Sequence, residues 1–441
     1  MQSRLSVVLA AALLALVVTV SGCASASKTW PQWRGPAGDG HSPEAGLPLE
    51  WSETSGVLWT RELPGWGAST PAIWGDALFV TAQDGAKLLL LRLDANTGAP
   101  IWERAVGEAQ AGRMELRLKS ADERKAQKFH HDHNLASPSP TTDGERVIVH
   151  FGNGELASYR FDGTLEWRRD LQKEHGAYTI WWGHANSPVL HDDLVISLCM
   201  QDSLGDLQAE LSPSYVVAHD KRTGEERWKT MRMTGAKSEP CDSYVTPIFR
   251  QGDAGVEMIV MGGTWLDAYD PRTGKQLWML PDLGGNRVIT GPVMSGDTVL
   301  ATVGMRGELL AVAPKGKDRL GTDAVRWRHK EGTPDTPCPI VVGDLVFIVN
   351  DNGIARCLDA KTGETRWTQR LGGDYRASPI AAAGRIYVSS TSGVCVVVQA
   401  SATFKKLAEN TLADAFFASP AAAGGRIYLR GKKRLYCVAG R

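Results

Sequence analysis

The sequence predicts an all-β fold, an eight-bladed β-propeller built from four-stranded antiparallel blades. Three observations predict it: a repeated turn that leads to a tryptophan, a repeated small-residue and proline pair that starts a strand, and a composition of 47 glycines and 15 tryptophans in 441 residues. Abundant glycine without helix-forming tracts favours many short strands joined by tight turns.

The first repeat is an Asp-x-x-Thr-Gly turn with a tryptophan four residues after the glycine. Aspartate accepts backbone N–H bonds in an Asx-turn, and glycine supplies the positive φ that closes a hairpin. The tryptophan offers a large flat side chain to a neighbouring sheet. Clear copies end at Trp102, Trp228, Trp278 and Trp367, weaker copies end at Trp167 and Trp327, and a degenerate copy has Phe404 in the tryptophan's place.

The second repeat places proline at the start of an apolar stretch that leads into a β-branched strand. Proline is tolerated at the first residue of a strand because no interior ladder bond is lost there. Each unit then holds four strands over about 40 to 60 residues, which is typical of a propeller blade. Eight copies begin at Pro71, Pro138, Pro188, Pro247, Pro292, Pro339, Pro379 and Pro420.

The two ends of the repeat region are incomplete in complementary ways. The eighth unit stops after residues 435–438 without a tryptophan strand, and an unassigned tryptophan strand with Trp59 lies at the other end. Pairing the two closes the ring and removes exposed strand edges. We therefore expect the propeller to span residues 51–441, interrupted by a charged loop or helix inserted at residues 107–134.

The N-terminal sequence is typical of a targeting signal. Arg4 precedes an apolar stretch at residues 7–20, which is too short to span a bilayer comfortably. Val20, Ser21 and Gly22 before Cys23 resemble a bacterial lipobox, so we expect a signal peptide at 1–22, lipidation of Cys23, and an N-terminal anchor and lead-in segment at 23–50. An ordinary secretory signal with an incidental cysteine is the alternative. Either way the protein faces the periplasm of a bacterial cell envelope, with a lipid anchor in the outer membrane favoured over the inner.

Charge and cysteine content exclude two classes of function. The 49 basic residues equal the 49 acidic ones, so the basic footprint of a nucleic-acid binder is missing. The six cysteines after Cys23 include no Cys-x-x-Cys spacing, so neither a zinc site nor a redox pair is indicated. Their disulfide pairing stays unassigned.

These repeats resemble the PQQ-like β-propeller repeat proteins over essentially the whole mature chain. Residues 30–36 (Trp-Pro-Gln-Trp-Arg-Gly-Pro), followed by Asp39 and Gly40, look like the lead-in of many envelope members. The resemblance implies the fold, which quinoprotein alcohol dehydrogenases share with the non-catalytic BamB-like outer-membrane assembly lipoproteins. Such a motif specifies the fold much better than the task, because one fold carries many functions.

Strand alternation places the loops that precede the prolines and the loops between second and third strands on one face, and the aspartate turns on the other. The loops that precede the prolines converge near the axis. Aromatic residues beside histidine and arginine on one rim are typical of recognition surfaces. The alternative is that the aromatic side chains merely cover the channel. The residues of this candidate binding rim are Trp66, His133, Asn134, Trp181, Trp182, His184, Asp242, Tyr244, Arg287, Asp374, Tyr375, Arg376, Phe416 and Phe417.

Two kinds of chemical site are conceivable, and the sequence favours neither. His131 and His133 with Asp132 could ligate a metal, but this set is incomplete, and a solvated loop is favoured. The quinoprotein resemblance implies PQQ and calcium on the axis and an aspartate base. Asp242 or Asp374 could serve as base, yet neither lies in a matching motif, and adjacent cysteines are missing. We therefore expect no catalytic residues, no metal and no cofactor.

The function predicted from the sequence is a non-catalytic, lipid-anchored propeller scaffold, BamB-like, which presents its loop-lined face to envelope proteins or peptides as a monomer. A PQQ-dependent quinoprotein oxidoreductase, with PQQ and calcium, is one alternative. A propeller that binds carbohydrate or another small ligand through Trp181 and Trp182 is the other.

Overall fold

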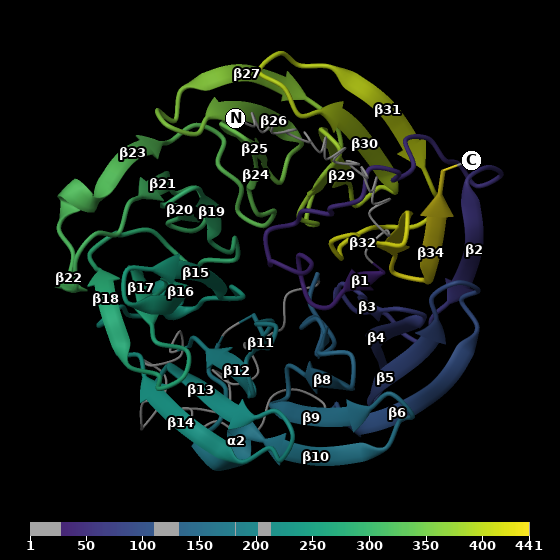
Figure 1. The fold of residues 1–441 in the computed structure, drawn as a ribbon, viewed down its shortest axis with the longest axis horizontal. Coiled ribbons are helices and arrows are strands. Elements are labelled where there is room, and N and C mark those ends of the chain that lie inside the picture. The colour runs from purple at the N-terminus through teal and green to yellow at the C-terminus, as the bar shows by residue number, and fades with distance from the viewer. Residues whose placement is uncertain (1–27, 110–131, 181, 202–212, 441) are drawn as a thin grey trace, which may run out of the picture.

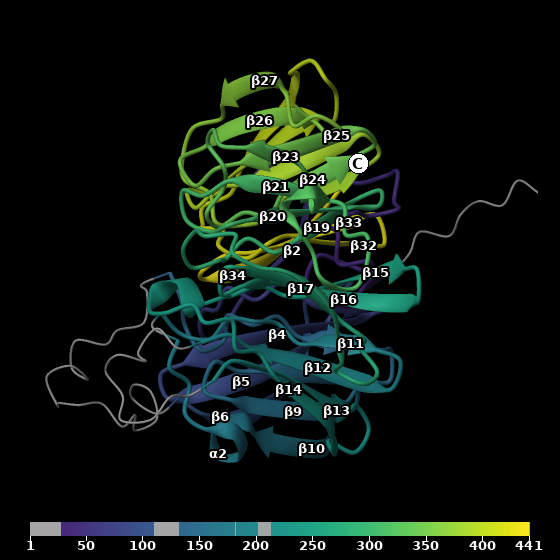
Figure 2. The ribbon, with the colours of Figure 1, turned by 90° about the vertical axis from the view of Figure 1, so that its left-hand side faces the viewer.

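The computed structural model describes residues 28–109, 132–180, 182–201 and 213–440. Eight separate β-sheets surround a central axis, and each forms one blade of a closed ring (Figure 1; edge-on in Figure 2). The predicted eight-bladed, four-stranded, antiparallel propeller is confirmed. The predicted signal peptide, the lipidation site Cys23 and most of the 107–134 insertion lie outside the described residues.

The first four blades follow the chain from the inner strand outwards. Blade 1 contains β3 (Ala72–Trp74), β4 (Ala77–Asp84), β5 (Lys87–Asp94) and β6 (Pro100–Glu108). Blade 2 contains β7 (Thr141–Thr142), β8 (Arg146–His150), β9 (Glu155–Arg160) and β10 (Leu165–Asp170). Blade 3 contains β11 (Val189–His191), β12 (Leu194–Cys199), β13 (Tyr215–Asp220) and β14 (Glu226–Met231). Blade 4 contains β15 (Ile248–Gly252), β16 (Gly255–Gly262), β17 (Trp265–Tyr269) and β18 (Gln276–Leu280).

The remaining blades repeat this order, except that the eighth borrows its outer strand from the N-terminal side. Blade 5 contains β19 (Val293–Ser295), β20 (Thr298–Thr302), β21 (Leu309–Val312) and β23 (Val325–His329). Blade 6 contains β24 (Ile340–Val342), β25 (Leu345–Val349), β26 (Ile354–Asp359) and β27 (Thr365–Arg370). Blade 7 contains β28 (Ile380–Ala382), β29 (Arg385–Ser389), β30 (Val394–Gln399) and β31 (Lys406–Thr411). Blade 8 contains β32 (Ala421–Ala423), β33 (Arg426–Arg430), β34 (Arg434–Ala439) and β2 (Val57–Glu62).

A few short elements are added to the blades. β1 (Thr29–Trp30) extends blade 1 beside β3, and β22 (Asp318–Arg319) runs parallel to β18. The part of the chain that the structure describes contains the helical turns α2 (Leu171–His175), η2 (Glu239–Cys241) and η3 (Thr322–Ala324). Within the described ranges no helix has the length and apolar character needed to cross a membrane.

The hydrophobic pattern explains why the blades stack. The second and third strands are sandwiched between two neighbouring sheets, so β12 and β13 are buried at every position. The outer strands face solvent on one side, and β14 accordingly has no buried residue. The six cysteines from Cys199 to Cys437 are all buried, and within the described ranges they form no disulfide. They therefore behave as small hydrophobes rather than as disulfide partners.

The turn tryptophans connect consecutive blades. In six cases the indole Nε1 donates to a backbone carbonyl in the turn region of the next blade, at 2.8–3.2 Å. The turn glycine makes room for the ring: at both Gly224 (φ 71°) and Gly363 (φ 73°) an added Cβ would lie 2.6 Å from an indole carbon. The donor and acceptor residues are Trp59 and Ala95, Trp102 and Phe161, Trp167 and Lys221, Trp228 and Pro271, Trp327 and Ala360, and Trp367 and Ser401.

Blade 4 departs from this arrangement. Trp278 donates instead to Glu257 Oε2 in its own blade, at 2.9 Å. The blade 5 region that would receive it is occupied by the insertion with β22 and η3. Arg250 Nε also donates to Glu257 Oε2, at 2.7 Å, so the carboxylate substitutes for the missing carbonyl of the next blade.

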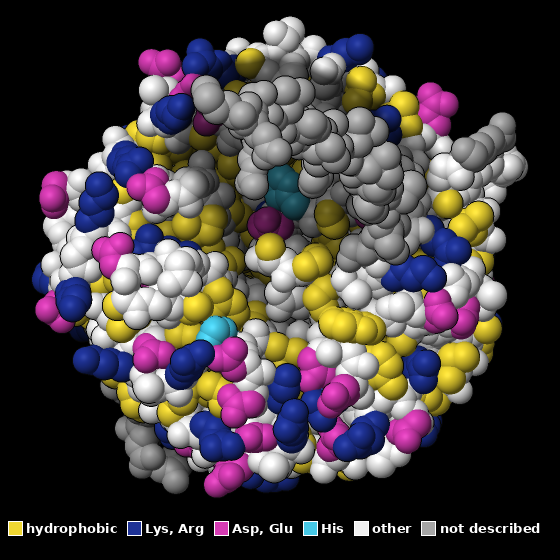
Figure 3. All heavy atoms as spheres, in the orientation of Figure 1, with side chains coloured by type: hydrophobic (Ala, Val, Ile, Leu, Met, Phe, Trp, Pro, Cys, Tyr) yellow, Lys and Arg dark blue, Asp and Glu magenta, His cyan; other side chains and the backbone are white. Residues whose placement is uncertain are grey.

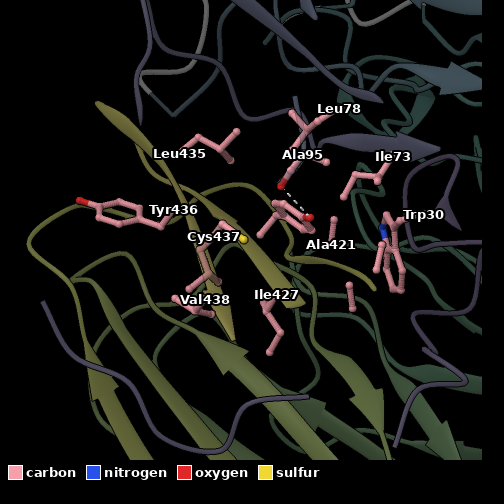
Figure 4. Packing of buried hydrophobic residues seen from close by; sticks show 14 of the residues in the cluster. Trp30, Ile73, Leu78, Ala95, Ala421, Ile427, Leu435, Tyr436, Cys437 and Val438 are labelled. Atoms are coloured by element: carbon pink, nitrogen blue, oxygen red, sulfur yellow. Dashed lines mark hydrogen bonds between the residues drawn. The ribbon is translucent and has the colours of Figure 1, made fainter. Parts of the chain in front are cut away.

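The ring is completed where the two ends of the chain meet. β2 pairs antiparallel with β34, with Thr60 opposite Tyr436, so blade 8 combines an N-terminal strand with three C-terminal ones. Figure 4 shows the hydrophobic side chains packed between blades 8 and 1, where the Tyr428 hydroxyl donates to Ala95 O at 3.1 Å. Closure therefore rests on a shared core as well as on strand pairing.

The chain before β2 lies across the ring. The Thr142 N–H donates to Pro31 O, the Ser42 N–H to Ala381 O, and the Trp51 N–H to Asn410 Oδ1, which ties this segment to blades 2 and 7. The face seen in Figure 3 carries interspersed acidic and basic side chains around its perimeter and is hollowed at the centre. This charge distribution agrees with the zero formal net charge of the chain.

Candidate functional site

The loops that precede the inner strands share one face with the loops between second and third strands. Within blades they are joined by backbone hydrogen bonds: the Gln83 N–H donates to Trp66 O, and the Thr391 N–H donates to Asp374 O. We call this face the loop face. The opposite face carries the Asp-x-x-Thr-Gly turns, and we call it the turn face. The sequence placed both sets of loops on one face, and these bonds agree with that placement.

A central cavity of about 620 Å³ opens among these loops, and we call it the funnel. Its walls combine loop side chains with the small residues that start the inner strands, such as Ser139 and Ser378, and Trp33 from the N-terminal segment also lines it. The other charged and aromatic side chains that line the funnel are Asp132, His133, Trp182, Tyr244, Arg287, Arg306, Lys330, Asp335, Asp351, Arg376 and Phe417.

A chain of polar contacts runs around the funnel. The Trp182 Nε1 of blade 3 donates to Glu239 Oε1 at 3.2 Å. Arg287, which precedes blade 5, bridges Glu239 Oε1 at 3.1 Å and Asp335 Oδ2 at 3.0 Å. The Asp335 N–H then donates to Asp351 Oδ2 at 2.8 Å.

The chain continues to the opposite side of the ring. Arg376 of blade 7 contacts Asp351 Oδ1 at 3.5 Å and donates from Nε to Asp132 Oδ2 at 3.3 Å. Asp132 precedes blade 2, so its contact with blade 7 reaches past blades 8 and 1. We call the seven residues Trp182, Glu239, Arg287, Asp335, Asp351, Arg376 and Asp132 the charged belt. Four ion pairs, the indole bond of Trp182 and the backbone bond from Asp335 to Asp351 together link loops from six blades.

Asp335 is a largely buried carboxyl of the belt. Burial raises its pKa to about 6, against the opposing charge of Arg287. Its Oδ1 is buried and has no hydrogen-bond partner among the described residues. A carboxyl with a raised pKa inside a cavity is typical of functional sites. Burying its charged form costs free energy, and binding of a ligand or a proton offsets that cost.

Blades 8 and 1 contribute an aromatic part to the same face. The rings of Trp66 and Phe417 meet edge to face with centroids 6.3 Å apart. The ammonium of Lys432 lies 4.3 Å from the Phe417 centroid and 5.1 Å from that of Trp66. This half-buried cation–π group offers both apolar area and a positive charge to a partner.

The structure brings six of the predicted rim residues together in the funnel, and Trp66 adjoins them through Phe417. Asp374 is exposed on the loop face but does not line the funnel, and Trp181 lies outside the described residues. The six residues that line the funnel are His133, Trp182, Tyr244, Arg287, Arg376 and Phe417.

Five predicted rim residues are buried and do not line the funnel. Each is buried beneath the loop face with at most 8% of its surface exposed, so none presents a binding side chain there. Two of them pack into cores between blades: Phe416 packs edge to face on Tyr436, and Tyr375 belongs to the cluster between blades 6 and 7. These five buried residues are Asn134, His184, Asp242, Tyr375 and Phe416.

The sequence reading missed the acidic half of the belt. Asp335 precedes the Pro337 strand start, and Asp351 lies in the loop between β25 and β26, so both stand in loops already assigned to this face. The repeats therefore predict the loops of both residues, but not the direction of each side chain. Glu239 lies in the same loop as the predicted Asp242 and Tyr244, before the strand that starts at Pro247, and was not predicted.

The funnel residues do not fit the calcium site that quinone cofactors accompany. Calcium takes six to eight oxygen ligands, whereas Asp132 and Asp335 are engaged by arginines and Asp351 accepts bonds from Asp335, Thr336 and Arg376. Among the described residues, the only three Asp, Glu, His or Cys side chains whose ligand atoms converge lie elsewhere, in blades 2 and 3. We derive no chemical step through such a group.

Comparison with known proteins identifies the repeat. A family model described as outer membrane protein assembly factor BamB matches residues 46–196, 92–369, 306–404 and 353–440. The chain belongs to this family. The predicted resemblance to PQQ-like repeat propellers is thereby confirmed.

Solved structures show the same fold at low sequence identity. BamB from Moraxella catarrhalis is 13% identical with a TM-score of 0.57, and the match covers 87% of this chain and 97% of that one. Quinohemoprotein alcohol dehydrogenase from Comamonas testosteroni is 14% identical with a TM-score of 0.65, covering 95% and 82%. At such identities the likeness concerns the fold alone.

A curated relative matches over a shorter stretch. Serine/threonine-protein kinase AfsK of Streptomyces griseus is 29% identical over 185 residues, which is 39% of this chain and 21% of the kinase. The chain therefore spans about a fifth of that relative's length.

Proposed function

We propose that this protein is a non-catalytic scaffold of the bacterial cell envelope that binds a protein or peptide through the funnel and the loop face around it. The charged belt is the observation that carries the proposal. It is a continuous set of charge-assisted contacts that spans loops of six blades and lines a polar cavity.

The chemistry of the funnel suits an extended peptide with polar and charged groups. Arg287 and Arg376 offer planar, bidentate donors to carboxylates and carbonyls, and Asp335 offers an under-used acceptor. The aromatic group of Trp66, Phe417 and Lys432 adds apolar area at one edge. Aromatic and arginine side chains are the types most enriched at binding hot spots.

Membership of the BamB family supports a place in the envelope and a partner in outer-membrane protein assembly. The lipid anchor at Cys23, a periplasm-facing ring at the outer membrane and a monomeric propeller complete the proposal. A tethered rigid ring gains effective concentration toward membrane-bound partners, so modest affinity at the funnel would suffice.

Co-purification of the full-length protein from envelopes solubilised in mild detergent tests this function. The wild type is compared with an Arg287→Gln/Arg376→Gln variant, which removes both cations of the belt. Recovery of the associated envelope protein should fall at least about tenfold, since charged partners in desolvated sites contribute on the order of 1.5–3 kcal/mol each.

The matched control changes two lysines on the turn face, Lys361→Gln/Lys405→Gln, where both side chains are exposed. It should leave recovery unchanged. Equal recovery by all three proteins, with intact folds by thermal melting, contradicts the proposal. Quinone absorbance and dye-linked alcohol oxidation after addition of PQQ and calcium would favour an oxidoreductase instead, and glycan binding lost in Trp182→Ala would favour a carbohydrate-binding propeller.

A further inference from the structure

A buried histidine far from the funnel has unused coordination capacity. His219 lies in β13, on the side of the sheet that also carries Tyr215 and Val217 toward blade 2. Its side chain is fully buried, and neither ring nitrogen has a hydrogen-bond partner among the described residues. Burying polar atoms without partners is costly, so such an imidazole needs an explanation.

Two further ligand-type side chains come from blade 2. Glu174 and His175 stand at the end of α2, which lies beside β10, β13 and β14 in Figure 1. One ligand atom from each of Glu174, His175 and His219 lies within 4.8 Å of the other two. Segments from two blades therefore bring a carboxylate and two imidazoles to one point.

A fourth group stands next to them. Glu226 in β14 is the cross-strand partner of His219, and its Oε2 lies 3.3 Å from His175 Nε2. The carboxylate is partly exposed, so the cluster opens toward solvent at the rim of the ring. A metal ion could enter there without opening the blades.

We propose that Glu174, His175 and His219 form a binding site for a divalent transition metal ion, of which zinc is the best match. Two imidazoles and one carboxylate form the mixed N/O donor set that zinc accepts, with a water or Glu226 free to take the fourth position. The ion would satisfy the orphaned imidazole and join α2 of blade 2 to the strands of blade 3.

The present neighbours of the ligands are cations that the metal would have to replace. Lys229 Nζ lies 3.2 Å from His175 Nδ1, and Arg169 Nε lies 3.0 Å from Glu174 Oε1. Both cations repel a metal ion and compete for its ligands. Removing Lys229 should therefore tighten metal binding, an effect that a purely structural histidine cluster would not produce.

The test titrates zinc chloride into the full-length protein in detergent, stripped with EDTA and free of any histidine tag, with calorimetry and thermal unfolding as readouts. We expect one zinc ion per chain and a rise in Tm. Affinity should fall at least about tenfold in Glu174→Gln and His175→Ala. Lys229→Met should bind several-fold tighter.

Two histidines elsewhere provide matched controls. His191→Ala in blade 3 and His133→Ala at the funnel should bind zinc as the wild type does. Because His219 is buried, His219→Leu is used as a second loss variant: it removes the orphaned nitrogens and should fold in EDTA yet gain no Tm from zinc.

Three results would overturn the proposal. They are no saturable zinc binding at 1:1, binding unaffected by both Glu174→Gln and His175→Ala, and binding lost in His133→Ala while His175→Ala retains it.

Discussion

The turn face and the loop face belong to the same eight blades, yet the turns of the one repeat closely while the long loops of the other do not. On the turn face, tryptophans of six blades each donate to a turn carbonyl of the next blade, and the turn glycine leaves room for the ring. On the loop face, each blade contributes a different loop, and contacts such as Arg376 with Asp132 skip over neighbouring blades. Repeated contacts build the ring, and the contacts that do not repeat make its surface specific.

The largest effect should come from the glycine that accommodates a ring. At Gly363 a Cβ would lie 2.6 Å from Trp327, whereas at Gly343, in the same blade, nothing lies within 4 Å, although φ is positive at both. Alanine costs about 1 kcal/mol at each for its backbone conformation, and overpacking adds about 2 kcal/mol at Gly363. Gly363→Ala should thus lower the free energy of unfolding by about 3 kcal/mol and Gly343→Ala by about 1 kcal/mol, as measured by urea denaturation. Equal losses would show that the glycine contact with tryptophan does not stabilise the ring.

Replacing the tryptophan at the irregular junction after blade 4 should destabilise the fold more than replacing the tryptophan at a regular junction. Trp278→Phe leaves the buried Glu257 with one donor fewer, while Trp228→Phe frees a backbone carbonyl near the surface. Hydrogen bonds to charged groups are the stronger class, so we expect losses of about 2 and about 1 kcal/mol respectively. The same denaturation curves measure both, and the reverse order would contradict the role assigned to Glu257.

Asp335 should make the loop face sensitive to pH. Its folded pKa of about 6 lies above the unfolded value of about 3.9, so the folded state binds the proton more tightly and loses stability as pH rises from about 4 to about 6. The shift corresponds to at most about 3 kcal/mol, and partial solvent access reduces it to about 1–2 kcal/mol. Asp335→Asn should therefore be more stable than the wild type by about that amount at pH 7.5 and nearly equal at pH 4. A difference independent of pH would refute the raised pKa.

The smallest stability effect is expected at the aromatic group of the loop face. Lys432→Ala removes a partly exposed cation from the rings of Trp66 and Phe417, worth about 0.5 kcal/mol. A loss above about 2 kcal/mol would mean that Lys432 stabilises the ring rather than serving the surface. Thermal melting beside the wild type distinguishes the two.

How well each face could be predicted from the sequence depends on whether its structure repeats from blade to blade. The turn, tryptophan and proline repeats predicted eight blades because each copy is a local pattern that reports a local structure. The exception at Trp278 was not predictable, since the sequence of its turn is regular and only the insertion before β23 redirects it.

The candidate site was predictable only in part. The repeats placed Arg287, Arg376 and Phe417 on the right face, because loop positions follow from strand alternation. Whether a loop residue points into the funnel or into a blade core depends on one residue of register, which is why Arg376 lines the funnel while Tyr375 is buried. Arg376 and Asp132 are 244 residues apart, and a local sequence pattern cannot predict such a contact.

The most direct test of the central claim, that the loop face carries recognition, is site-specific photo-crosslinking in intact envelopes. A photoreactive phenylalanine analogue replaces Phe417 at the funnel in one variant and Ile101, which is 52% exposed on the outer strand of blade 1, in the other. We predict a discrete crosslinked envelope protein from position 417 that is lost on adding Arg287→Gln/Arg376→Gln, and none from position 101. The same product from both positions, or a product from 417 that survives the double substitution, would contradict the account.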